Sequence, residues 1–179
     1  MKKLFLICLI YLFHVYLLFG QIETPDSANI TISQALHKAK SLNKNTLIIF
    51  KATWCKWCSK LDSLLSDSTV HKIFSEHYVI VKLNVREKEE KKKTHENPGA
   101  YQKLIEYGGE KSGIPFLAFI DQEGDLIANS NVMPENENVG FPTTDEEISS
   151  FLKLLKKTAP KITEGQLKII SDRLRSFAN

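Results

Sequence analysis

The stretch TLIIFKATWCKWCSKL, residues 46–61, joins a short apolar run directly to a pair of cysteines. Residues 46–52 are continuous, apolar and rich in β-formers, which is typical of a strand buried on both faces. From Leu61 onward, leucines recur at helical spacing. The pattern therefore predicts a central strand that passes straight into a helix, with Cys55 at the start of the helix and Cys58 one turn further on.

This position gives Cys55 a physical reason to ionise. The first N–H groups of a helix have no partner within it, and the helix dipole favours negative charge there. Such placement can lower a cysteine pKa from about 8.5 to between about 3.5 and 7.5, and the thiolate is the nucleophile in disulfide exchange. Cys55 is therefore the candidate attacking sulfur. Cys58, set back into the helix, would be more buried and would resolve the mixed disulfide formed with a partner.

The first twenty residues predict a secretory signal. Lys2 and Lys3 precede an apolar run over residues 4–19, and Gly20 follows. A basic start, an apolar middle and a small residue at the exit are typical of a signal peptide. The run is short for a membrane span, which needs roughly 20 apolar residues. We expect cleavage near Gly20, rather than retention of residues 4–19 as an anchor, and an exported protein that is periplasmic or secreted.

Loss of this signal peptide, residues 1–20, has two consequences. Cys8 goes with it, so Cys55 and Cys58 remain as the only cysteines, in a compartment where disulfides persist. The mature chain keeps 22 basic and 21 acidic residues, a formal charge of +1. No basic excess indicates nucleic acid, so we expect no nucleic-acid partner.

The rest of the chain alternates between helix and strand patterns. With 42% apolar and 25% charged residues, it has the composition of one globular domain. We expect an N-terminal linker over residues 21–29 and one α/β domain over 30–179, with a central mixed β-sheet flanked by helices. In the first half of the chain, we further expect a helix from a cap at Thr31 or Ser33 to about 43, a short helix capped by Ser68, and a strand over 77–85. In the second half, we expect a helix over about 101–107 and a hairpin over 113–129. The chain then continues with a helix capped by Thr144, with Glu147 at the capping-box position, and an extra C-terminal helix over 163–176.

Two tryptophans flank the cysteines. The rings of Trp54 and Trp57 could exclude water and offer a partner polypeptide a flat apolar contact, or one could belong to the core while the other covers the helix. Lys56, between the cysteines, could add positive potential beside the thiolate. Lys51 either marks the end of the strand or reaches toward the active-site edge.

A proline stands at the head of the strand in SGIPFLAF, residues 112–119. A bond preceding proline is the only peptide bond that adopts the cis form at modest cost. A cis Ile114–Pro115 bond could expose the backbone of Ile114 to a bound peptide, whereas a trans proline would simply begin an edge strand.

These motifs, in this order, resemble the thioredoxin superfamily: strand, W-C-x-x-C, helix, strand, helix, then a G-x-P-x-x-x-F strand, a hairpin and a closing helix. More narrowly, WCKWCSKLDSLLSDSTVHKIFSEHYVIVKLNV is similar to the group that includes the C-terminal domain of bacterial transmembrane disulfide reductases. The resemblance covers about residues 30–158. It implies a thioredoxin-like fold.

The resemblance also implies roles for single residues. Cys55 would be the nucleophile, Cys58 the resolving cysteine, Pro115 a cis-proline beside them and Trp54 a residue that shapes the site. One departure concerns Ile49, because thioredoxins carry a buried acid six residues before the first cysteine. The candidates left for the proton acceptor are water, Lys51, or an Asp or Glu from another segment.

Two segments lie outside the basic family pattern. The charge block over residues 86–97 can be a solvated helix end or loop, or a docking surface. The other segment is the helix after residue 163. Partner choice would be decided in these two segments.

Three functions remain open at this point. The first is an exported thiol-disulfide oxidoreductase that acts on protein or peptide thiols and disulfides, in the reductase direction, as a monomer, without a cofactor and with a membrane-bound electron donor. The second is binding of a soft metal such as Cu(I) or Zn(II) by the two cysteines, although His71, His77 and His95 lie in other segments. The third is a non-catalytic interaction module in which a disulfide acts as a staple.

Overall fold

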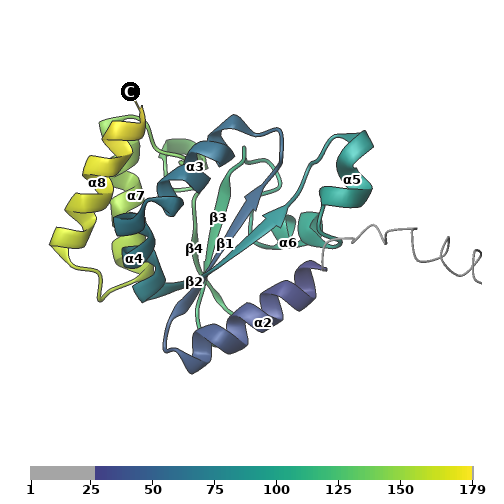
Figure 1. Ribbon diagram of the computed structural model, residues 1–179, viewed down its shortest axis with the longest axis horizontal. Helices are drawn as coiled ribbons and strands as arrows, with labels where there is room; N and C mark the ends of the chain where they lie inside the picture. Colours follow the sequence, from purple (N-terminus) through teal and green to yellow (C-terminus); the bar gives the residue numbers. More distant parts are fainter. Residues whose placement is uncertain (1–26, 179) are drawn as a thin grey trace, which may run out of the picture.

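The computed structural model describes residues 27–178 of the chain. Within them, a four-stranded mixed sheet lies between helices on both faces (Figure 1). The strand order is β2-β1-β3-β4; β1 is parallel to β2 and antiparallel to β3, and β4 is antiparallel to β3. The strands are β1 (Asn45–Lys51), β2 (Tyr78–Asn84), β3 (Phe116–Ile120) and β4 (Leu126–Asn129). The expected signal peptide over residues 1–20 and the linker residues 21–26 lie outside the described part.

The central strand β1 is buried on both faces, as its apolar run predicts. Leu47 and Ile49 pack into the core on one face, while Ile48 and Phe50 pack into the core on the other. The first face is covered by α3 (Lys56–Ser66), α4 (Ser68–His77), α7 (Asp145–Thr158) and α8 (Glu164–Ala178) (Figure 1). The second face is covered by α2 (Ala28–Ser41) and α6 (Ala100–Glu106).

Two helices begin earlier than the sequence predicts. The cap of α2 is Ser27, whose side chain accepts the N–H of Ile30, and not Thr31 or Ser33. Ala28 is fully buried, and its N–H donates to the carbonyl oxygen of Pro98. Residues 27–29 thus belong to the folded domain and not to the linker. Likewise, α4 is capped by the carboxylate of Asp67 instead of Ser68, because a carboxylate accepts two N–H groups there.

The charge block forms a short helix, α5 (Glu89–His95), that carries no buried residue. The interpretation of this block as a solvated helix end is therefore correct for residues 89–95. Arg86 and Glu87, which precede the cap residue Lys88, are different, because they contact Trp54 and Thr53 next to Cys55.

The C-terminal helices are close to their predicted positions. The capping box at the start of α7 is present: Thr144 accepts the N–H of Glu147, and the Glu147 carboxylate accepts the N–H of Thr144. Burial opposes ionisation of Glu147, but the donors of Thr143 and Thr144 outweigh it and lower its pKa. The extra helix α8 packs on the same face, and the Lys60 amine of α3 donates to the carbonyl oxygen of Phe177 over 3.0 Å.

Candidate active site

The two cysteines lie at the predicted junction of strand and helix. Cys55 is the N-cap of α3, and its Sγ accepts the backbone N–H of Cys58 over 3.1 Å. The two sulfurs form a disulfide, with the Cα atoms 5.2 Å apart. The difference in burial is smaller than expected, since Cys55 is 4% and Cys58 2% exposed. A thiolate at Cys55 would have this N–H as a donor in place from the start.

The Ile114–Pro115 bond is cis, so the alternative with a trans proline is wrong. The carbonyl oxygen of Ile114 lies 3.4 Å from Sγ of Cys55. The Ile114 side chain packs against a small buried cluster of Ala52 and the two cysteines. The structure thus brings together the two segments that the sequence singled out, although they lie about sixty residues apart in the chain.

The side chain of Asn138 binds the backbone on both sides of the cis bond, in residues 113–115, called the proline loop below. Its side-chain amide donates to the carbonyl oxygens of Gly113 and Pro115 over 2.9 and 3.0 Å. Its Oδ1 accepts the hydroxyl of Ser130 and the N–H of Gly140. One side chain therefore satisfies the carbonyl groups on both sides of Ile114. No local pattern in the sequence marks Asn138 for this role.

Neither tryptophan belongs to the core, so that alternative is wrong. Trp54 is 51% exposed, and its indole N–H donates to the carbonyl oxygen of Arg86 over 2.8 Å. Trp57 is 46% exposed, and its ring stacks on that of Phe141 with centroids 6.0 Å apart. The Lys60 amine lies 5.1 Å from the centre of the Trp57 ring. Both rings are held by contacts on one side and open to solvent on the other.

Ile49 stands where the family carries an acid, and an acid of α3 pairs with lysines of the neighbouring strands. Ile49 is buried and pairs across the sheet with Lys82. Asp62, one helical turn beyond Cys58, forms ion pairs with Lys51 and Lys82. Burial opposes ionisation of Asp62, but the two ammonium groups outweigh it and lower its pKa. Of the two alternatives for Lys51, the structure shows the end of the strand: it is the last residue of β1, and its amine donates to Asp62 of α3.

Glu87 is a buried acid that the sequence analysis does not identify. It is 7% exposed, and its carboxylate accepts the N–H of Thr53 over 2.6 Å and the Thr53 hydroxyl over 2.8 Å. It thereby fixes the residue two positions before Cys55. Glu87 stands within a run of charged residues, and the contact spans 34 positions, so no local signal distinguishes it from its solvated neighbours.

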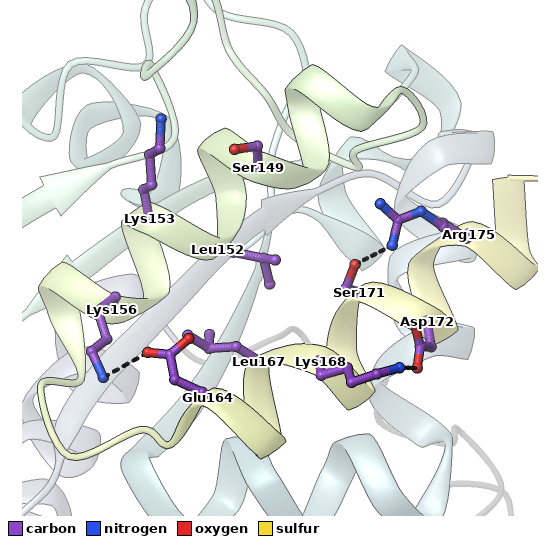
Figure 2. Close-up of a pocket in the computed structure, with 10 residues that line it drawn as sticks. All are labelled: Ser149, Leu152, Lys153, Lys156, Glu164, Leu167, Lys168, Ser171, Asp172 and Arg175. Atoms are coloured by element: carbon purple, nitrogen blue, oxygen red, sulfur yellow. Dashed lines mark hydrogen bonds and ion pairs between the residues drawn. The ribbon is translucent and has the colours of Figure 1, made fainter.

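A hollow of about 540 Å³ lies between α7 and α8 (Figure 2). Its charged side chains are largely paired: Lys156 with Glu164, and Lys168 with Asp172. Leu152, which the helical pattern would bury, lines this hollow and is only partly buried. None of its lining residues comes from the cysteine or proline loop. It is therefore separate from the disulfide site.

The described residues contain no cluster of side chains suited to bind a metal ion. Among residues 27–178, no three side chains of His, Cys, Asp or Glu come close enough together to hold a metal ion. The same residues include no helix of the length and hydropathy that a membrane crossing requires.

The family model Thioredox_DsbH, described as "Protein of unknown function, DUF255", matches residues 16–174. The chain belongs to this family. The strand order and the family together confirm the predicted thioredoxin-like fold. The matched region includes the cysteine pair, the cis-proline and the described residues up to 174.

Two relatives of this chain carry names that refer to disulfide chemistry. It is 30% identical over 105 residues to "Disulfide bond reductase DsbH" of Chlamydia pneumoniae, over 57% of this chain and 61% of that protein. It is 25% identical over 140 residues to "Protein disulfide isomerase-like 1-1" of Arabidopsis thaliana, over 73% of this chain and 26% of that protein. The chain thus spans less than two thirds of either relative.

A solved structure shares the fold. The disulphide isomerase of Xylella fastidiosa Temecula1 superposes with a TM-score of 0.51 and 19% identity, covering 88% of this chain and 98% of that one. At this identity the match concerns the arrangement of the elements alone.

Proposed function

We propose that this chain is a thiol-disulfide oxidoreductase that works through the Cys55 and Cys58 couple. The observation that carries the proposal is the position of the Cys55 sulfur, which caps α3, accepts the N–H of Cys58 and lies 3.4 Å from the carbonyl oxygen of Ile114. The names of two relatives, a disulfide bond reductase and a disulfide isomerase, support the same chemistry.

In the reductase direction, the Cys55 thiolate attacks one sulfur of a substrate disulfide and releases the other as a thiolate. Cys58 loses its proton and attacks Sγ of Cys55, which releases the second substrate thiolate and leaves the Cys55–Cys58 disulfide. Two electrons pass from the dithiol to the substrate. A further dithiol protein must then reduce the pair again, and we propose a membrane-bound donor for an exported enzyme.

The substrate is proposed to be a protein or peptide disulfide. Trp54 and Trp57, which precede and follow Cys55 in the sequence, each expose about half of their surface, and the carbonyl oxygen of Ile114, next to Pro115, lies 3.4 Å from the Cys55 sulfur. An extended polypeptide can lie against these surfaces while its disulfide reaches the sulfur. We propose that the enzyme acts as an exported monomer, periplasmic or secreted, and needs no bound cofactor.

Turnover of insulin tests this function. The Cys8→Ser variant, reduced beforehand, should cleave insulin disulfides catalytically when a dithiol is supplied. Adding Cys55→Ser should abolish turnover without unfolding the chain, because a serine hydroxyl is also a good N-cap acceptor. Full activity in the Cys55→Ser variant would overturn the proposal.

Two other readouts address the alternatives. Copper or zinc retained in stoichiometric amount after purification would favour metal binding. A disulfide that dithiols fail to reduce in the folded protein would favour a structural staple.

A further inference from the structure

Arg86 joins the two loops that form the candidate active site. It follows β2 and has a positive φ of 54°, a backbone conformation that is uncommon for residues other than glycine. Its carbonyl oxygen accepts the indole N–H of Trp54 over 2.8 Å. The backbone of Arg86 thus holds the ring next to the first cysteine.

The side chain of Arg86 holds the other loop. Its guanidinium donates to the carbonyl oxygens of Ser112, Glu110 and Gly109 over 2.7, 2.6 and 3.2 Å. These three residues lead directly into the cis Ile114–Pro115 bond. A planar fork with several N–H donors suits such a set of acceptors, and a lysine amine does not reproduce it.

Further contacts fix Arg86 itself. The guanidinium carbon lies 5.8 Å from the centre of the Tyr101 ring, on α6. The next residue, Glu87, accepts two hydrogen bonds from Thr53, so the loop is also tied to the strand end before Cys55. Arg86 is therefore held at its own position while it contacts both sides of the site.

Arg86 lines one surface hollow, and the residues whose carbonyl groups it binds line another. It lines one of about 710 Å³, together with Tyr101 and residues of the charge block. Its carbonyl partners Glu110 and Ser112 line a second one, of about 660 Å³, which includes Gly113. A polypeptide lying across the proline loop would pass next to this arginine.

We propose that Arg86 is a positioning residue for polypeptide substrates: it sets Trp54 and the loop before Ile114 at a fixed separation on the two sides of Cys55. The inference rests on the proposed function, and it assigns a residue that does not touch the reacting sulfurs. Without the guanidinium, the loop loses three donors while Trp54 keeps its bond to the Arg86 carbonyl oxygen, so the loop is no longer tied to the residue that holds the ring. A polypeptide then loses a surface ordered before it binds. A small disulfide, which reaches only the sulfur, needs no such surface.

The test compares two substrates in the Cys8→Ser background. Steady-state rates are measured with insulin and with hydroxyethyl disulfide, for Arg86→Ala, Arg86→Lys and the matched control Arg173→Ala. Arg173 is an arginine on α8 that forms an ion pair with Asp67. We expect Arg86→Ala to raise KM for insulin about tenfold, the equivalent of one hydrogen bond to a charged group, while kcat changes little.

The expected pattern separates positioning from folding. KM for hydroxyethyl disulfide should stay within about twofold of its value without the substitution, since the guanidinium does not contact the sulfurs and its loss should not alter access to them. Arg86→Lys should restore part of the insulin KM, and Arg173→Ala should leave both substrates unaffected. An equal loss on both substrates, or no change with insulin, would overturn the proposal.

A second measurement keeps the two proposals distinguishable. If the Cys8→Ser protein reduces neither disulfide, the proposed function fails. The positioning role is then decided by amide hydrogen exchange of residues 109–114 in the oxidised protein. Exchange about tenfold faster in Arg86→Ala than in Arg173→Ala supports the positioning role, and equal exchange overturns it.

Discussion

The backbone N–H of Cys58 donates to Sγ of Cys55 over 3.1 Å, so the sulfur of the first cysteine caps the helix that carries the second. A sulfur in this position receives a hydrogen bond and the positive end of the helix dipole, both of which favour its thiolate. The asymmetry between the two cysteines therefore follows from the start of α3. It leads to the first two predictions.

In the reduced protein, the Cys55 thiol should ionise well below the usual value. With Cys8 and Cys58 replaced by serine, the rate of alkylation by iodoacetamide should rise with pH around a midpoint between about 3.5 and 7.5. The reaction at each pH can be followed by mass spectrometry. A midpoint at or above that of free cysteine would show that the helix start does not activate this sulfur.

The resolving role of Cys58 predicts a trapped intermediate. In a Cys8→Ser, Cys58→Ser protein, the attack by Cys55 can occur, but nothing displaces the substrate from the mixed disulfide. A covalent adduct with a disulfide peptide should accumulate and be visible by mass spectrometry without reductant. The corresponding Cys55→Ser variant should give no adduct, and an adduct at Cys58 instead would reverse the assignment.

Asn138 should be needed to hold the proline loop. Asn138→Ala removes the donors to the carbonyl oxygens of Gly113 and Pro115, and should lower the free energy of unfolding by about 1–3 kcal/mol. Urea unfolding measures the change. Asn138→Asp keeps the acceptor for Ser130 but not the donors, so it should be destabilised as well.

The control for Asn138 is Glu137→Ala, an exposed neighbour. Its unfolding free energy should stay within about 0.5 kcal/mol of that of the unsubstituted protein. If Asn138→Asp is as stable as the unsubstituted protein, the amide donors do not matter for the loop.

The ion pairs of Asp62 predict a pH-dependent contribution to stability. Because Lys51 and Lys82 lower the pKa of Asp62 in the folded state, the unfolded state takes up this proton first as the pH falls. The contribution should be complete above the unfolded pKa of about 3.9, and lost as the pH falls through the folded pKa. Asp62→Asn should thus be less stable at pH near 7, by about 1 kcal/mol, and equal at low pH.

Urea unfolding over this pH range measures the difference between Asp62→Asn and the unsubstituted protein. Asp172→Asn, on an exposed helix pair with Lys168, is the matched control and should cost less at neutral pH. A cost of Asp62→Asn that does not change with pH would contradict the ionic interpretation.

Much of the fold could be predicted because its signals are local. The run from Leu47 to Phe50 has no polar side to expose, so it must be a central strand, and Thr144 with Glu147 forms a complete capping box. The start of α2 was harder to predict. Ser27, Thr31 and Ser33 can all cap a helix. With Ser27 as the cap, the N–H of Ala28 donates to the carbonyl oxygen of Pro98, a contact remote in sequence.

The site could be predicted in part for the same reason. Cys55 and Cys58 are only three positions apart in the sequence, and Pro115 stands in a recognisable motif. By contrast, Arg86, Glu87 and Asn138 act through hydrogen bonds to residues more than twenty positions away. Polar side chains of this kind are common on surfaces, and only the fold shows which of them have partners.

The most direct test of the account is the reduction potential of the Cys55–Cys58 disulfide. The Cys8→Ser protein is equilibrated with glutathione buffers of known ratio, and the free thiols are then counted after labelling with a thiol-reactive reagent. The account predicts one reversible two-electron transition between about −120 and −270 mV, within the range of disulfide-exchanging proteins. A potential well below about −300 mV would identify a structural disulfide and contradict the proposed function.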